Sequence, residues 1–273
     1  MLAVALSTPL ATELSLVGGK AASLIRLAQA GFAVPDGYVL TSAFFLPWIN
    51  ELRSSSEWRL VRDKLGSTDS SSLREACVSA KRLVDDLPFT RKQRAQLEDV
   101  QAGMQAGMGD QPTAVRSSSP EEDLSGTSFA GLYETVLNVT RDRLEQAVRS
   151  CFASCLDERV LLYKREHDLS VEAPTIAVIV QAQLASDISG VGFSLNPLTN
   201  DFDETLINAS WGQGQALVSG DINPDRFVIN KVSGEIVERL TGSKGGDRPD
   251  EVCLSDEQLS KLSEMLKAIE DLY

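Results

Sequence analysis

The sequence is poor in the residues that most often build metal centres and nucleophilic triads. Its 273 residues include one histidine, His167, and four cysteines, none of which forms a CxxC pair. A structural zinc site needs about four closely spaced nitrogen, sulfur or carboxylate ligands, and a Ser/His/Asp or Cys/His triad needs a histidine beside the nucleophile. Neither pattern is present. His167, in "YKREHDLS", is expected at the surface near the end of a helix.

The sequence also lacks long apolar runs and an excess of positive charge. No stretch reaches the roughly 18 to 20 apolar residues of a membrane helix, and the opening "MLAVALSTPLA" lacks the positive region of a signal peptide. Lys and Arg total 26 against 39 Asp and Glu, for a net charge of −13. This charge argues against nucleic acid or an anionic membrane as the main partner. We expect a cytoplasmic protein with reduced thiols, in which any anion site is built locally.

The chain holds a mixture of helical and strand patterns. Residues 42–110 are expected to be mostly helical, and "TAVRSSS" then predicts a strand running into a loop. The nearly unbroken apolar run in "PTIAVIVQAQL" predicts a strand buried on both faces. "RFVINKVSGEIVERL" predicts a hairpin, and Ser255 with Gln258 predicts a capping box at the start of the last helix. The pattern indicates an α+β protein with two lobes and a cleft between them.

A glycine pair precedes Lys20 in "VGGKAASLIRLAQAG", at the expected start of a helix. Backbone N–H groups are unpaired at a helix start, and the helix dipole favours anions there. A lysine adds a mobile positive charge suited to phosphate. The string is not a P-loop, which needs G-x-x-x-x-G-K-[ST]. Taken alone, it is better interpreted as a glycine-flexed helix start with a solvated lysine.

A polar loop follows Arg116 in "AVRSSSPEEDLSGTSFAGLYETVLNVT". Such a loop can bring N–H and O–H donors close to phosphate oxygens, and Arg116 at the strand end can form a bidentate contact to phosphate. The apolar segment that begins at Gly131 would anchor the far end of this loop. A surface loop without any ligand accounts for the same pattern equally well.

Two further segments allow a nucleotide contact. Gln181, in "VIVQAQLASDISGVGFSLNP", offers an amide donor and acceptor to an adenine ring, although a core strand with a polar end is the better interpretation of the pattern alone. Gly212, Gly214 and Gly220, in "INASWGQGQALVSGDINPDRF", permit a close approach of the backbone to a ligand. They are equally typical of hairpin turns.

Together and in this order, these four stretches resemble the N-terminal ATP-binding domain of the phosphoenolpyruvate synthase and pyruvate phosphate dikinase family, to which rifampicin phosphotransferase is closely similar. The resemblance runs from about Val17 to Lys231. It implies a divergent ATP-grasp fold with Mg-ATP held between two lobes. In this family ATP is cleaved to AMP and phosphate, and the β-phosphoryl group passes, usually through a histidine on another domain or subunit, to a small-molecule acceptor such as pyruvate or an antibiotic.

The resemblance also implies roles for individual residues. Lys20 and Arg116 match the family's phosphate-binding lysine and arginine and are the expected catalytic residues. The expected cofactor-binding residues, for ATP with Mg²⁺, lie in the loop, at its end and beside adenine: Ser128, Gly131, Thr135 and Gln181. The metal ligands are expected beyond Tyr273, on an acidic strand and a following strand with glutamine and arginine.

The same resemblance predicts how the chain is divided. Residues 1–110 form the mostly helical part of the first lobe, residues 111–180 the loop and the remainder of that lobe, and residues 181–273 an incomplete second lobe. We therefore expect a fragment or one piece of a split enzyme, which transfers phosphoryl groups poorly by itself. Its partners would be phosphohistidine and acceptor-binding domains or subunits outside this chain.

Two positions depart from the family pattern. Asn208 and Gln215 stand where many relatives have glutamate, although the dikinase branch also has asparagine at the first position. Three functions therefore stay open: an AMP-forming phosphotransferase, an ATP-dependent ligase that uses the same domain, and an ATP-binding module without catalysis. Gln215 fits the third of these, and nothing in the chain selects the acceptor.

Overall fold

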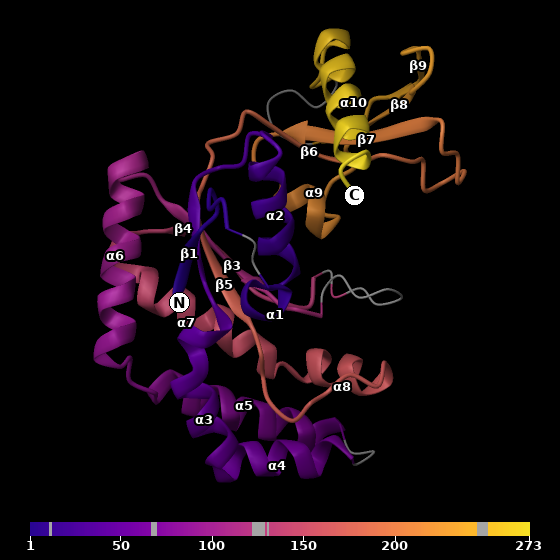
Figure 1. The fold of residues 1–273 in the computed structure, drawn as a ribbon. Helices are drawn as coiled ribbons and strands as arrows, with labels where there is room; N and C mark the ends of the chain where they lie inside the picture. Colours follow the sequence, from indigo (N-terminus) through magenta and orange to yellow (C-terminus); the bar gives the residue numbers. More distant parts are fainter. Residues whose placement is uncertain (11–12, 67–69, 122–128, 130, 245–250) are drawn as a thin grey trace. The chain divides into compact units, whose positions relative to one another are not determined.

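The computed structural model describes all residues except 11–12, 67–69, 122–128, 130 and 245–250. The chain divides into two compact units, Met1–Gln183 and Leu184–Tyr273. Each unit holds one antiparallel sheet with its own helices (Figure 1). The α+β class predicted from the sequence is therefore confirmed, and the three-part division predicted above stays a prediction.

The sheet of the first unit has five strands in the order β1-β2-β5-β3-β4. Their bounds are β1 Ala3–Ala5, β2 Gly37–Leu40, β3 Thr113–Ser118, β4 Thr135–Val139 and β5 Ala177–Ala182. β5 is the central strand, and five of its six residues are buried. The strand predicted from the apolar run is confirmed, because a central strand covered on both faces needs apolar side chains on both.

Helices cover both faces of this sheet. On one face lie α1 (Leu14–Val17) and α2 (Gly19–Gln29), where Ala21 and Ile25 pack against Val39 and Ile179. The other face carries the larger core, built on Val115, Val178 and Val180. The helices of that core are α3 Leu46–Ser54, α4 Ser56–Leu65, α5 Ser70–Asp86, α6 Arg91–Met108, α7 Leu144–Ala153 and α8 Glu158–Glu166, with 3-10 turns η1 Ser42–Phe45, η2 Arg141–Arg143 and η3 Ser154–Leu156.

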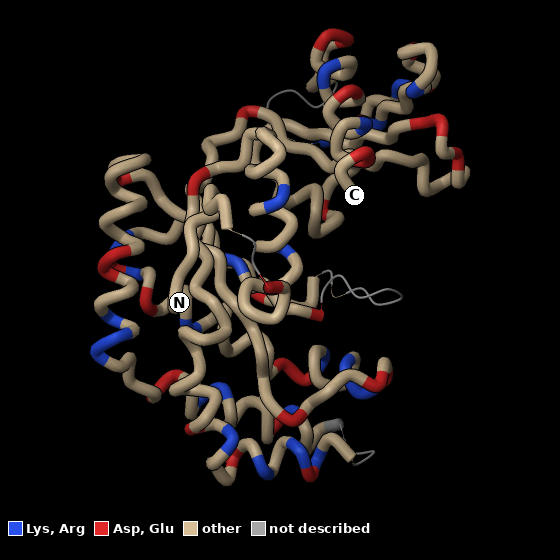
Figure 2. The backbone as a smooth tube through the Cα atoms, viewed as in Figure 1, with Lys and Arg blue, Asp and Glu red and all other residues tan. Residues whose placement is uncertain are grey.

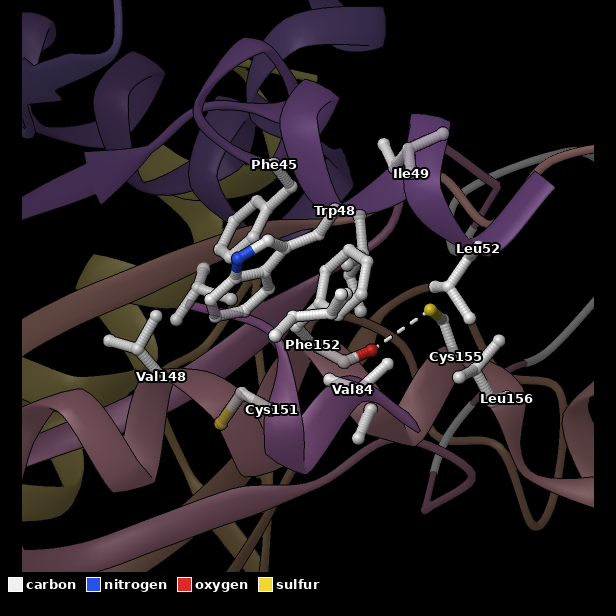
Figure 3. Close-up of a cluster of buried hydrophobic side chains, with 14 of the residues drawn as sticks. Phe45, Trp48, Ile49, Leu52, Val84, Val148, Cys151, Phe152, Cys155 and Leu156 are labelled. Carbon is white, nitrogen blue, oxygen red and sulfur yellow. Dashed lines mark hydrogen bonds between the residues drawn. The ribbon is translucent and has the colours of Figure 1, made fainter. Parts of the chain in front are cut away.

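Aromatic rings fill the centre of the larger core (Figure 3). Phe45 stacks on Phe152 with ring centroids 4.9 Å apart, and Trp48 meets the same ring edge-on at 5.3 Å. The Cys155 thiol donates to the carbonyl of Phe152 at 2.9 Å. Burial raises the pKa of Cys155 to about 12. All four cysteines of the chain are free and buried, so none reaches the surface as a reactive thiolate.

The second unit has a four-stranded sheet in the order β6-β7-β8-β9. Its elements are β6 Ile188–Phe193, β7 Glu204–Trp211, α9 Gln215–Ser219, β8 Asp225–Asn230, β9 Ile236–Leu240 and α10 Asp256–Glu270. The predicted hairpin is formed by β8 and β9, with Gly234 at φ +75° between them. The short helix α9 was expected as a loop.

Helix α10 covers the sheet of the second unit through its apolar face. Leu259 is fully buried and packs with Ile207 and Phe227. The predicted capping box is confirmed: Ser255 Oγ accepts from the amide of Gln258 at 3.3 Å, and Gln258 Oε1 accepts from the amide of Ser255 at 2.9 Å. This reciprocal pair satisfies two backbone donors at the helix start.

Charged residues lie mainly on the helices and loops (Figure 2), and Arg116 is the one charged residue in the strands of the first sheet. Within the described part of the chain, no helix is both long enough and apolar enough to cross a membrane.

Candidate functional site

The start of α2 packs directly against the end of β3. Gly18 precedes the helix at φ +76°, and a Cβ atom there would lie 2.2 Å from the carbonyl oxygen of Ser118. The amide of Gly19 donates to Ser119 O at 2.9 Å, and the amide of Ala21 donates to Ser118 Oγ at 3.1 Å. Gly18, the first glycine of the pair before Lys20, therefore has a local reason: it permits a close approach to Ser118 that no larger residue allows.

These bonds correct one expectation from the sequence. The amides of Gly19 and Ala21 are not available to an anion, because they already donate to the protein. The serines after Arg116 also have structural partners: Ser117 Oγ donates to Glu134 O at 2.9 Å, and Ser118 Oγ accepts from Ala21. Both serines are buried, at 1% and 0% exposure. Any phosphate bound at the start of α2 would therefore not be held by these amides and serine hydroxyls.

Arg116 lies on the face of the sheet that α2 covers. It stands opposite Ile179 of β5 and opposite Thr135 of β4. Directly opposed residues of an antiparallel pair share a face, and Ile179 packs in the cluster formed with α2. Lys20, in the first turn of α2, is half-buried, as is Arg116. The structure thus brings Lys20, Arg116 and Thr135 to one side of the sheet.

Lys20 and Glu134 both act on the buried thiol of Cys151. Burial raises the pKa of Cys151 to about 12, the negative charge of Glu134 adds to the rise, and the positive charge of Lys20 opposes it. The same thiol donates to Val115 O at 3.4 Å. The positive charge of Lys20 therefore acts on a thiol that is hydrogen-bonded to Val115, the residue before Arg116.

The remaining predicted site residues differ in accessibility. Gly131 is exposed at φ +72°, and no atom lies within 4 Å of the position its Cβ would take. Gln181 is buried on β5, opposite Ala114 of β3, and its Nε2 donates to Pro35 O at 3.1 Å. This bond occupies one of the two amide donors that we expected to face adenine. Ser128 lies outside the described residues.

Helix α8 holds both ends of the segment between β3 and β4. Lys164 Nζ lies 2.6 Å from Glu121 Oε2, and the lysine side chain is only 3% exposed. Beyond the undescribed part, buried Phe129 meets Tyr163 edge-on at 4.7 Å. Lys164 was not among the residues expected at the site. Its place on the buried side of α8, with Val160 and Leu161, is the pattern that indicates a buried cation.

A second buried ion pair lies in the second unit. Lys244 Nζ donates to Asp225 Oδ1, and both side chains are fully buried. The amides of Gly242 and Cys253 also donate to the Asp225 carboxylate, at 2.9 and 2.8 Å. Burial alone would raise the pKa of Asp225, but these donors outweigh it and hold that pKa below its ordinary value. The pair joins β8 to the segments on either side of residues 245–250.

The two positions that depart from the family pattern lie apart in the second unit. Asn208 is a half-buried residue of β7, opposite Arg226 of β8, and Gln215 is the exposed first residue of α9. Among the described residues, no group of three or more His, Cys, Asp or Glu side chains is placed to hold a metal ion. A Mg²⁺ ion that binds mainly through phosphates and water does not need such a group.

Comparison with known proteins gives a consistent result. The model of the pyruvate phosphate dikinase AMP/ATP-binding domain matches residues 14–273. An uncharacterized phosphotransferase of Bacillus subtilis strain 168, YvkC, is 34% identical over 276 residues, which are 94% of this chain and 30% of that protein. The phosphoenolpyruvate synthases of Aeropyrum pernix and Pyrococcus furiosus are 33% and 27% identical and cover 95% and 96% of this chain. This chain spans 32% and 39% of their lengths.

Proposed function

Since this chain belongs to the family of the pyruvate phosphate dikinase AMP/ATP-binding domain, we propose that it is the Mg-ATP-binding part of an AMP-forming phosphotransferase. Lys20 and Arg116 bind the phosphates. The observation that carries this assignment is their position: both lie on the α2 face of the first sheet, and the Ala21–Ser118 hydrogen bond of 3.1 Å joins the two segments that bear them.

The two cations have different tasks in this proposal. Arg116 is half-buried in a strand with opposed neighbours on both sides, so its planar guanidinium is held for a two-point contact to one phosphate. Lys20 is a compact point charge on a flexible stem, which can follow a phosphoryl group as it moves. Phosphoryl transfer depends on positioning and charge neutralisation, and these residues supply both.

The other contacts follow from the same fold. We propose the divergent ATP-grasp arrangement, with the nucleotide held between two lobes. Thr135 and Gly131 contact the phosphates at the end of the segment anchored by α8, and Gln181 lies beside adenine. Lys20 and Arg116 fit the triphosphate by charge, and Mg²⁺, when bound with ATP, would neutralise further negative charge.

The reaction of the whole protein is part of the proposal. Water takes the γ-phosphoryl group of ATP, which leaves as phosphate. The β-phosphoryl group goes to a histidine on another domain or subunit, which leaves AMP, and then from the histidine to a small hydroxyl or enol acceptor. The relatives are named as a phosphotransferase and as phosphoenolpyruvate synthases, which favours this transfer over a ligase reaction.

The test compares nucleotides that differ only in phosphate number. We expect Lys20→Ala and Arg116→Ala each to weaken Mg-ATP binding by roughly 10- to 100-fold, because each removes a charge-assisted contact of about 1.5 to 3 kcal/mol. Binding of AMP, which lacks the outer phosphates, should change much less. Isothermal titration of the wild type and the two variants with each nucleotide measures all six affinities.

Matched controls separate a site effect from a general loss of charge. Lys92→Ala and Arg62→Ala remove exposed cations on α6 and α4 and should leave both affinities unchanged. Equal ATP affinity in the wild type and in both site variants would contradict the assignment.

A further inference from the structure

Strand β4 contains one residue too many for regular pairing with β3. Thr113 stands opposite Val139, but Val115 stands opposite Val136 and Arg116 opposite Thr135. Leu137 and Asn138 therefore face the single residue Ala114, which defines a β-bulge. Such a bulge changes the register by one residue, and a one-residue change moves every side chain beyond it to the other face of the sheet.

The bulge decides which residue of β4 meets Arg116. Regular pairing continued from Thr113 and Val139 would place Val136 opposite Arg116. With the bulge, Val136 packs into the large core beside Val115, and Thr135 shares the face of Arg116 instead. The extra residue therefore places the polar hydroxyl of Thr135 on the face of Arg116. Without it, the apolar side chain of Val136 would lie there.

The bulge includes an unusual backbone conformation at Asn138. Its φ is +55°, in the left-handed region, which asparagine enters more readily than most residues other than glycine but still adopts in a minority of cases. Gln183 holds it there from 45 residues away: the amide of Asn138 donates to Gln183 Oε1 at 2.6 Å, and Gln183 Nε2 donates to Asn138 Oδ1 at 2.8 Å. Unusual backbone angles persist only where surrounding groups enforce them.

Gln183 is well placed to act as an anchor. Its own amide donates to Pro112 O at 3.2 Å, just before β3, so one residue contacts the beginning of β3, the bulge of β4 and the end of β5. It is also the last residue of the first unit. The three strands it joins carry Arg116, Thr135 and Gln181.

We propose that Gln183 is a positioning residue of the nucleotide site: by holding Asn138 in the left-handed conformation it maintains the β4 bulge that puts Thr135, and not Val136, on the face of Arg116. This inference rests on the proposed function for the roles of Arg116 and Thr135. The register it describes does not depend on that function and has its own test.

The register test uses thiol labelling. Because all four native cysteines are buried with raised pKa values, an introduced cysteine is labelled over a low background. Thr135 is exposed and Val136 is half-buried, so the thiol of Thr135→Cys should react about 10-fold faster or more than that of Val136→Cys. Gln183→Met keeps the length of the side chain but removes its two hydrogen bonds with Asn138. It should make the labelling rates of the two introduced cysteines similar. Gln183→Glu keeps an acceptor for the Asn138 amide and should restore the difference.

The functional test measures Mg-ATP affinity in the same Gln183 variants without the added cysteines. Gln183→Met should weaken binding by about 10-fold, the equivalent of one lost contact, and Gln183→Glu should bind like the wild type. Asn138→Gly, which adopts positive φ freely and keeps the backbone donor, should also stay close to the wild type. A residue that only stabilised the fold would change the free energy of unfolding and leave the Mg-ATP affinity of the folded protein unchanged.

The outcomes are distinguishable. Unchanged labelling rates in Gln183→Met would overturn the register claim. Converging rates with unchanged ATP affinity would overturn the positioning role and leave the proposed function intact. Absence of ATP binding in the wild type would contradict the proposed function, and the labelling rates would still decide whether Gln183 maintains the bulge.

Discussion

The backbone amide of Ala21 donates to the hydroxyl of Ser118 at 3.1 Å, across 97 residues of sequence and in a fully buried position. Ala21 directly follows Lys20, and Ser118 stands two residues after Arg116 on the same face of β3. A single hydrogen bond thus connects the two segments that carry the proposed phosphate-binding cations. The close packing at Gly18 makes this connection possible.

A comparison of alanine substitutions at Gly18 and Gly31 tests the contact between the start of α2 and Ser118. Both have positive φ, +76° and +86°, but a Cβ at Gly18 would lie 2.2 Å from Ser118 O, whereas nothing lies within 4 Å of one at Gly31. Gly31→Ala should therefore cost only the backbone strain of about 1–2 kcal/mol. Gly18→Ala should cost distinctly more and should also weaken Mg-ATP binding, because the start of α2 must move away from β3.

Urea unfolding and ATP titration of the two variants measure these effects. Gly31→Ala is the control for strain alone and should bind ATP normally. Equal stability and equal ATP affinity of the two variants would show that the contact between Gly18 and Ser118 does not position Lys20.

The ion pair of Lys164 and Glu121 predicts an asymmetry between its two partners. Lys164 is 3% exposed and Glu121 20% exposed, with 2.6 Å between the charged atoms. Glu121→Ala leaves a buried ammonium group without its carboxylate and should lower the free energy of unfolding by up to about 3 kcal/mol. Lys164→Met removes the buried charge and fills a similar volume, so the cost should be smaller.

Hydrogen exchange at the amides of β5 reports the stability of the first unit alone. The predicted order of protection is wild type, then Lys164→Met, then Glu121→Ala. A greater loss of protection in Lys164→Met than in Glu121→Ala would contradict the asymmetry, and Lys92→Ala, an exposed cation on α6, serves as the control.

Asp225 predicts a pH dependence in the second unit. Its pKa is lowered in the folded state by Lys244 and two backbone amides, against the opposing effect of burial. A lowered folded pKa means that the stabilisation is fully present above the unfolded carboxyl pKa of about 3.9 and is lost as the pH falls below it towards the folded value. The protection of the β8 amides, measured relative to their intrinsic exchange rate at each pH, should fall over that range.

Asp225→Asn supplies the contrast. It should be less stable than the wild type at neutral pH, because Lys244 loses its carboxylate in a fully buried position. Its β8 amides should show a weaker dependence on pH below about 4, since the group that titrates there is gone. If protection of the β8 amides varied with pH in the same way in the wild type and in Asp225→Asn, Asp225 would not be the group that causes the loss of stability at low pH.

Local patterns were enough to predict several elements. The apolar run of β5, the capping box of Ser255 and Gln258 and the turn at Gly234 each depend on residues close in sequence, and the structure has all three. The α+β class follows from such elements. The burial of the four cysteines does not follow from them and was not predicted.

The environments of several single residues depend on partners far away in the sequence. The sequence alone did not predict these environments. The serines after Arg116 suggested phosphate donors, but Ser118 bonds to Ala21 instead. Asn138 needs Gln183 to hold its positive φ. The burial of Lys164 depends on Glu121 lying 2.6 Å away. In each case the residue type permits several environments, and tertiary contacts select one of them.

The most direct test of the central claim is the labelling of lysines by an ATP analogue that carries an acyl group on its terminal phosphate. A lysine amine beside the phosphates attacks the acyl carbon, keeps the acyl group and releases ATP, and proximity makes this reaction fast only at the binding site. We predict that peptide mass spectrometry finds the label on Lys20, that excess Mg-ATP prevents it, and that Lys92 is not labelled in a manner sensitive to ATP. Labelling of Lys20 that ATP does not prevent, or ATP-sensitive labelling of other lysines alone, would contradict a phosphate site at Lys20 and Arg116.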